Sequence, residues 1–177
     1  CLVMERFGGL WMDSSILLSG PFPSALQHAL DQHTFVGFYI NGHTTNYAYP
    51  VIESWMFACT AHHPFTHAWA DTFVHGTKAH GSVDAHLEYL QKHEHVDVQK
   101  IHNLNYLLIH VCAQYVLQSV APSSSPAPSP DLLPITLPHW DMISFVAETG
   151  PFHYLVAHKW DSKTSVAALV QDIAHHR

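Results

Sequence analysis

The chain has 177 residues, a formal net charge of −7 and only seven Lys and Arg residues, which excludes the basic face that nucleic-acid binding requires. Its hydrophobic content of 47% is enough for a buried core, but no run of about 18 apolar residues indicates a transmembrane helix. Three cysteines without a CxxC pair do not make a disulfide framework. These properties predict one domain, or a large piece of one.

A glycine pair near the start of the chain, Gly8 and Gly9, separates a helix end from two short predicted strands, residues 10–13 and 15–19. Glycines here suit a helix C-cap and allow the backbone to run close to a ligand. Asp13 ends the first strand, where an open α/β sheet places its ligand-binding groups. The aromatic and hydroxyl neighbours of this acid are Trp11, Ser14 and Ser15.

The following region alternates helical and extended patterns, which predicts an α/β fold class. Apolar spacing and capping residues predict helices over residues 24–32, 64–74, 82–92 and 103–120. Concentrated β-branched and aromatic residues predict strands over residues 34–40 and 51–60. Residues 121–138 hold six prolines and five Ser or Thr residues, so we expect there a loop or insertion that packs as neither helix nor strand.

Two further acids are candidates for a site. Glu53 interrupts an apolar run, where a carboxylate is costly unless it is paired, hydrogen-bonded or facing a pocket, so we favour a pocket role. Glu148 precedes residues 149–151, a rigid turn that can present backbone N–H groups and a hydroxyl to phosphate or sugar oxygens. His153 follows this turn. Ordinary alternatives stay open, with Glu148 as a turn cap and His153 as a surface residue.

Three ordered blocks of sequence resemble the capsular polysaccharide synthesis family and its relatives among mannosyl and galactosyl transferases. Three blocks in order are more specific than one, because a lone glycine pair followed by an acid occurs often by chance. The blocks are residues 8–13, with Gly-Gly, Trp and Asp; residues 50–65, which end in the helix start His63, Pro64 and Phe65; and residues 148–154, followed by Trp160 and Asp161.

The resemblance implies a GT-A-like, Rossmann-like fold that transfers a sugar from a nucleotide-sugar donor to a glycan or polysaccharide acceptor, with retention of the anomeric configuration. In these relatives the acid at Asp13 belongs to an Asp-x-Asp element that holds a divalent cation against the diphosphate of the donor. Ser15 stands here in place of the second acid. By the same resemblance we expect residues 1–177 to be a single partial domain without its first nucleotide-binding strands, and residues 121–138 to be a surface excursion from it.

Combined with the residues above, the resemblance gives three groups of candidates. We expect Mn²⁺ or Mg²⁺ as the cofactor, and we expect Asp13, Glu53 and the turn at Gly150 to converge on one cleft. The catalytic candidates are Asp13, Glu53 and Glu148; the metal ligands are Asp13 and His153; the donor-binding residues are Gly8, Gly9, Trp11, Ser14, Ser15, Thr149, Gly150 and Pro151.

Two alternatives of other classes stay open. The missing second acid also fits an inactive transferase that acts as a carbohydrate-binding or scaffolding module. The 18 histidines also fit a metal-binding protein, because His63 and His67 are four residues apart on a predicted helix with Cys59 nearby. No HExxH motif accompanies them, so we expect most histidines to be exposed side chains without metal geometry. The resemblance leaves the compartment open.

Overall fold

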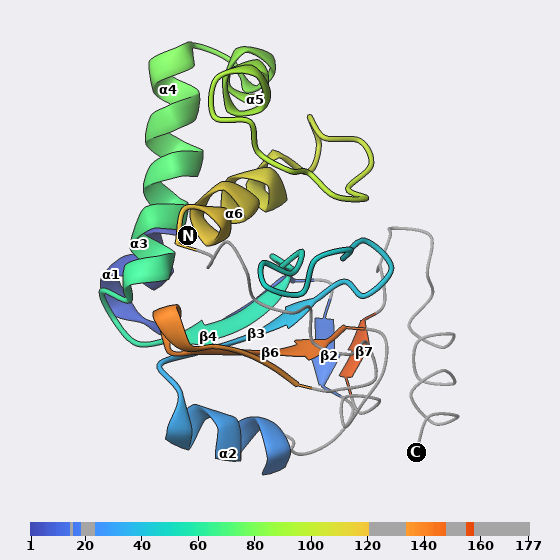
Figure 1. Cartoon of the computed structure of the whole chain (residues 1–177). Coiled ribbons are helices and arrows are strands. Elements are labelled where there is room, and N and C mark those ends of the chain that lie inside the picture. Colours follow the sequence, from blue (N-terminus) through green and yellow to red (C-terminus); the bar gives the residue numbers. More distant parts are fainter. Residues whose placement is uncertain (15, 19–23, 121–133, 148–154, 158–177) are drawn as a thin grey trace, which may run out of the picture.

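The computed structural model describes residues 1–14, 16–18, 24–120, 134–147 and 155–157. Helices and strands alternate in a mixed α/β fold, which confirms the predicted class (Figure 1). The elements in chain order are α1 (Leu2–Phe7), β1 (Gly9–Met12), β2 (Ile16–Leu18), α2 (Ser24–Gln32), β3 (Phe35–Tyr39), β4 (Met56–Cys59), α3 (Pro64–Ala70), the π-helix η1 (Asp71–His75), α4 (Gly76–His80), α5 (Val83–Lys92), α6 (Leu108–Gln118), β5 (Ile135–Leu137), the 3-10 helix η2 (Pro138–Trp140), β6 (Met142–Val146) and β7 (Leu155–Ala157).

Five strands form the main sheet, in the order β1-β4-β3-β6-β5. β4 is antiparallel to both of its neighbours, β1 and β3, whereas β3 and β6 are parallel. β5 returns antiparallel to β6. It follows that β1, β3 and β6 run in one direction and that their carboxyl ends lie at the same edge of the sheet. A separate antiparallel pair is made by β2 and β7.

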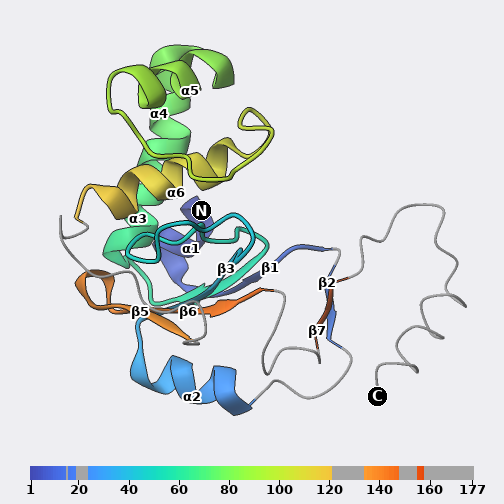
Figure 2. The same ribbon diagram turned by 45° about the vertical axis from the view of Figure 1, so that its right-hand side comes forward.

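The side chains of the sheet alternate between two cores, as the pleat of a strand requires. On β3, Phe35 and Tyr39 belong to the larger core, which also contains residues of α3 and α6. Val36 and Phe38 belong to the smaller core, which contains Leu26 of α2. Helices therefore cover both faces of the sheet, with α2 on one side and α3 and α6 on the other (Figure 2).

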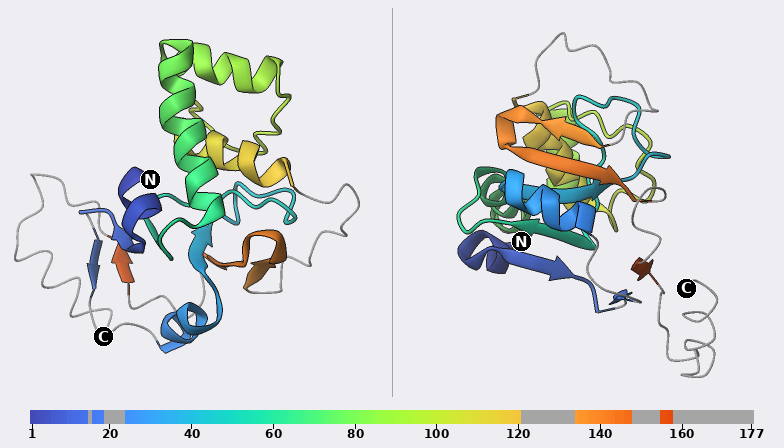
Figure 3. Two further views of the ribbon diagram at one scale, coloured as in Figure 1. Left: turned by 90° about the vertical axis from the view of Figure 1, so that its left-hand side faces the viewer. Right: turned by 90° about the horizontal axis from the view of Figure 1, so that it is seen from below.

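One helical rod projects from the sheet, because α3, η1 and α4 follow one another without a break (Figure 3, left). It runs six residues beyond the predicted end at residue 74 and stops at Gly81, which has a φ of 80°. Ser82 then caps α5 by accepting a hydrogen bond from the N–H of Ala85 at 3.1 Å, which confirms the predicted cap. Neither the rod nor another helix in the described ranges is long and apolar enough to cross a bilayer.

The widened turn of the rod accommodates a side chain from α5. Gly76 lies against the ring of His86, and a Cβ at this position would overlap the imidazole. Nε2 of His86 lies 2.9 Å from the carbonyl oxygen of Thr72, to which it donates. The glycine inside this helix is thus explained by close packing between the rod and α5.

Three sequence predictions of secondary structure are wrong in part. The helix predicted over residues 103–120 begins only at Leu108 and ends at Gln118. The segment predicted to be irregular contains β5, because Ile135 and Leu137 are buried while Thr136 between them is exposed, and the three pair with β6. The predicted strand over residues 51–60 is regular only in β4, since Ile52 makes an isolated bridge to Tyr39 and the chain turns before it enters the sheet.

Candidate functional site

The carboxyl ends of β1, β3 and β6 define what we call the carboxyl edge, where Asp13, Ile40 and Ala147 follow the three strands. The N–H of Ala147 donates to the carbonyl of Tyr39 at 2.9 Å, which ties the ends of β6 and β3 together. Open α/β sheets bind ligands outside the carboxyl ends of their strands. The carboxyl edge is therefore the candidate functional site.

The backbone of Asp13 is fixed by two hydrogen bonds, whereas its side chain projects into solvent. Its N–H donates to the carbonyl of Trp55 at 2.8 Å, and its own carbonyl accepts from the N–H of Ile16 at 3.0 Å. Its carboxylate is exposed and has no hydrogen bond or ion pair to another described residue. Trp11, on β1, is 39% exposed, and Ser14 lies in the exposed turn after the acid. The arrangement holds the backbone of this acid in place, and no residue in the described ranges engages its carboxylate oxygens.

Glu53 lies between the bridge at Ile52 and β4, and its side chain faces α6. Its N–H donates to the carbonyl of Phe38 at 2.8 Å, and its side chain is 16% exposed. Oε2 lies 3.5 Å from Nε2 of His110, whose side chain is only 5% exposed. Nδ1 of that histidine is buried and has no hydrogen-bond partner in the described part of the chain. Sequence reasoning singled out Glu53 but missed His110, for which the signal was a histidine inside an apolar helix.

A chain of neutral amides fixes the loop after β3 to α6. Oε1 of Gln99 accepts from the N–H of Thr45 at 2.6 Å, and its Nε2 donates to Oε1 of Gln114 at 2.7 Å. Nε2 of Gln114 in turn donates to the carbonyl of Pro50 at 2.7 Å. Gln114 is completely buried one helical turn after His110, so the loop and the helix that carries this histidine are linked.

The glycine pair lies at the other end of β1 from Asp13. Gly8 has a φ of 64°, and a Cβ there would lie 2.7 Å from the carbonyl oxygen of Cys59 and 2.8 Å from the carbonyl carbon of Thr60. Gly9 has a φ of 99° and open space around it. The close approach at Gly8 is therefore that of the chain's own backbone, and a contact of these glycines with a donor stays a prediction.

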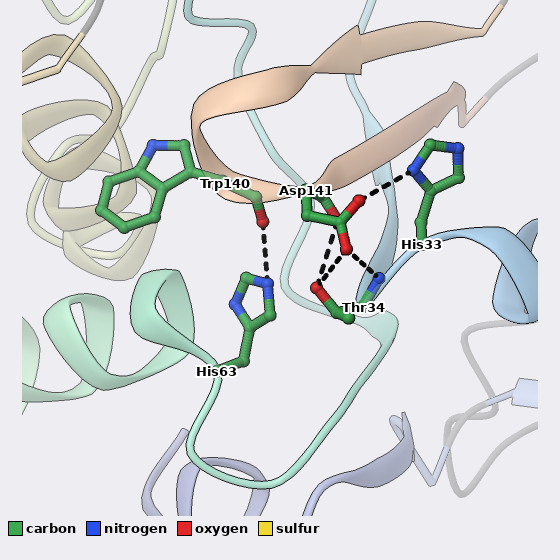
Figure 4. A network of polar contacts seen from close by, with 5 residues as sticks. All are labelled: His33, Thr34, His63, Trp140 and Asp141. Atoms are coloured by element: carbon green, nitrogen blue, oxygen red, sulfur yellow. Dashed lines mark hydrogen bonds and ion pairs between the residues drawn. The ribbon is translucent and has the colours of Figure 1, made fainter.

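The opposite end of the sheet, which we call the amino edge, carries a dense polar network (Figure 4). The carboxylate of Asp141, just before β6, accepts from the N–H of Thr34 at 3.1 Å and from its hydroxyl at 2.8 Å, and Nδ1 of His33 lies 3.4 Å away. These donors lower the pKa of Asp141. Nε2 of His63 donates to the carbonyl of Trp140 at 2.9 Å, and burial lowers the pKa of this histidine.

The zinc set considered for His63, His67 and Cys59 is not assembled. His67 is exposed and pairs with Oε1 of Glu5 at 3.4 Å, while His63 is buried against Trp140. Burial raises the pKa of the Cys59 thiol, which disfavours the thiolate that a metal needs. Across the described residues, no group of three or more His, Cys, Asp or Glu side chains is arranged to hold a metal ion.

The remaining predicted site residues lie outside the described residues. These residues are Ser15, Glu148, Thr149, Gly150, Pro151 and His153. Whether residues 148–153 converge with Asp13 and Glu53 stays a prediction. Ala147, the residue before them, lies at the carboxyl edge.

Comparison with known proteins assigns the chain to a family. A family model described as capsular polysaccharide synthesis protein matches residues 1–125, well over half of the chain. The chain belongs to the capsular polysaccharide synthesis protein family. No curated protein and no solved structure matches it. The matched region of this family includes Asp13, Glu53 and His110, and it ends before the block at residues 148–154. Membership links the protein to capsular polysaccharide synthesis.

Proposed function

We propose that the protein transfers a sugar from a nucleotide-sugar donor to a hydroxyl of a glycan or polysaccharide, with the carboxyl edge as its active site. The observation that carries this proposal is Asp13, an exposed carboxylate without a described partner at the carboxyl end of β1, inside the region that matches the family. Parallel strand ends at one edge and helices on both faces of the sheet support a GT-A-like fold.

Asp13 is suited to bind a divalent cation. Mn²⁺ and Mg²⁺ prefer hard oxygen ligands, and this carboxylate has both oxygens free of described partners. His153 is the proposed second protein ligand, while donor phosphates and water take the other positions. When bound, the cation neutralises the negative charge that the diphosphate gains as it leaves.

Glu53 is proposed to accept a hydrogen bond from the acceptor hydroxyl and so to orient its oxygen toward the anomeric carbon. That oxygen adds to the anomeric carbon while the bond from this carbon to the diphosphate breaks. The departing diphosphate oxygen takes the hydroxyl proton, which balances the step. The acceptor oxygen adds on the face of the sugar from which the diphosphate leaves, so the configuration is retained. Glu148 and the N–H groups of residues 149–151 are proposed to close the donor pocket, and the exposed ring of Trp11 to stack on the donor.

The experiment offers UDP- and GDP-hexoses with Mn²⁺ and measures the release of nucleoside diphosphate, first to water and then to methyl hexosides as acceptors. We expect turnover that chelator abolishes and that Asp13→Asn lowers by orders of magnitude, because both remove charge stabilisation from the leaving group. The control is Asp31→Asn, which changes an exposed aspartate of α2.

Two results would contradict the proposal. Full turnover in chelator, or unchanged turnover in Asp13→Asn, would make this acid a turn residue. Saturable binding of glycans without turnover of any donor would support instead the inactive carbohydrate-binding module that the serine at position 15 suggests.

A further inference from the structure

We infer that His110 is a positioning residue that holds the carboxylate of Glu53 for the acceptor hydroxyl. The inference rests on the proposed function and extends it to a residue of α6. Nε2 of His110 lies 3.5 Å from Oε2 of Glu53, and no other described residue is paired with this ring. The second carboxylate oxygen, Oε1, has no hydrogen bond or ion pair to a described residue, so it is the one available to a ligand.

The two other buried histidines show what is particular about His110. His63 and His86 each direct Nε2 at a backbone carbonyl, that of Trp140 and that of Thr72 respectively, both at 2.9 Å. Such contacts tie two segments of the fold together. In His110 the same ring nitrogen faces an ionisable side chain instead, at the edge of the sheet where ligands bind.

The chemistry of a buried imidazole sets the direction of this contact. With a proton on Nε2, a neutral ring donates toward Glu53 and leaves an unpaired acceptor at Nδ1. The other tautomer would bury an unpaired donor at Nδ1 and turn a lone pair toward the carboxylate, which costs more. A separation of 3.5 Å is longer than an optimal hydrogen bond. Contacts of this kind are often long without substrate and tighten when it binds. Glu53 is thus held at Oε2 while Oε1 receives the hydroxyl of a sugar acceptor.

The position of His110 on α6 supports this role. The helix is apolar, and its buried polar side chains are His110 and Gln114. The side-chain amide of Gln114 accepts a hydrogen bond from Gln99 and donates one to the carbonyl of Pro50, so its buried polar atoms are satisfied. No comparable structural contact accounts for His110 within the described residues, because the ion pair with Glu53 is the one polar interaction of its ring there.

The test measures transfer from a nucleotide-hexose to a methyl hexoside in parallel with hydrolysis of the same donor by water. We expect His110→Leu to reduce kcat/KM for the methyl hexoside by about ten- to a hundredfold, the usual cost of losing an orienting partner, and to leave donor hydrolysis within about twofold. His110→Gln keeps a donor near Nε2 and should recover most of this loss. The matched control is His63→Leu, which removes an equally buried ring at the amino edge and should leave the acceptor kcat/KM unchanged.

A second measurement does not depend on activity. The ¹⁵N resonance of Nε2 of His110 should shift in Glu53→Gln, and the resonance of His63 should not. Absence of this shift, or an equal loss of hydrolysis and transfer in His110→Leu, would overturn the inference. A protein that shows the shift but turns over no donor would refute the proposed function and leave the pairing intact. If His110→Leu does not fold, transfer and hydrolysis are measured for His110→Gln and Glu53→Gln instead. A loss of transfer in Glu53→Gln that His110→Gln does not share in part would then overturn the inference.

Discussion

The two edges of the sheet treat their acids in opposite ways. At the amino edge, Asp141 accepts two hydrogen bonds from Thr34 and faces His33. At the carboxyl edge, Asp13 has a fixed backbone, but no described residue donates to its carboxylate. The polar contacts of Asp141 serve the fold, whereas the exposed carboxylate of Asp13 has no such contact with a described residue. Asp13 follows β1 and Asp141 precedes β6, so the two acids have similar places in the fold. They differ in their hydrogen-bond partners.

The largest difference between the two edges is expected when the same substitution, aspartate to asparagine, is made at Asp13 and at Asp141. Asp13→Asn should reduce sugar transfer by about a hundredfold to a thousandfold, because a well-placed charge is worth about 3 to 4 kcal/mol in a transition state. The midpoint of thermal unfolding should not change. Rates of transfer and thermal unfolding are measured on the same preparations. An unfolding midpoint that falls together with the rate would erase the contrast between the edges.

A second contrast lies within the glycine pair. Gly8→Ala should lower the free energy of unfolding by about 3 kcal/mol, since the new Cβ meets the backbone after Cys59 and the left-handed conformation is strained. Gly9→Ala has the strain without the overlap and should cost about half as much. Urea unfolding measures both, with turnover per folded molecule as the control. Equal losses in the two variants would mean that the contact at Gly8 contributes nothing.

Asp141→Asn should lower the free energy of unfolding by about 1 kcal/mol without a change in turnover. The loss is modest because this side chain is 54% exposed, and solvent screens its interactions. Asparagine tolerates the left-handed φ of 45° at this position, whereas Asp141→Ala adds strain and should cost more. Thermal unfolding checks the order, and reduced turnover in Asp141→Asn would show that the amino edge also serves catalysis.

The smallest expected effect is a pH dependence of stability at His63. Burial holds the pKa of this ring below the usual histidine value of about 6.5, opposed by its contacts with Trp140 and Asp141. In the window between the lowered folded pKa and about 6.5, the unfolded chain binds more protons, so stability falls as the pH falls. Urea unfolding at pH 7 and pH 5.5 should show a smaller decrease for His63→Gln than for the wild type. The control His62→Gln changes a neighbouring exposed histidine and should keep the wild-type dependence.

Local patterns predicted the elements that local chemistry determines. The bounds of α2 match the predicted helix over residues 24–32, and Ser82 caps α5 as expected. β5 was hidden because the prolines before it dominate the composition of its segment, while its stability comes from pairing with β6. The apolar run Met142–Val146 gives β6, which no prediction included. Strands such as β5 and β6 are defined by the strands that they pair with more than by their own sequence.

In the candidate site, too, residues with an unusual local sequence could be predicted, and a residue that depends on a distant contact could not. Asp13 and Glu53 were identifiable, because an acid at a strand end and an acid in an apolar run are each unusual in their local sequence. A histidine inside an apolar helix is also unusual, but the role of His110 was not identifiable from it, because that role depends on a carboxylate that is far away in the chain and close only in the folded structure. A histidine on an apolar helix has no local pattern that separates a positioning residue from a core residue.

The amide chain through Gln99 and Gln114 gives the carboxyl edge a mechanical property. It joins the loop after β3 to α6 through neutral side chains, so the linkage carries no charge that salt could screen or that protonation could remove. The amino edge, by contrast, depends on the ionised carboxylate of Asp141 and on His63, whose pKa burial lowers so that it stays neutral in the fold. Acidification should therefore loosen the amino end of the sheet first, while the hydrogen bonds between the loop and the helix that carries His110 stay in place.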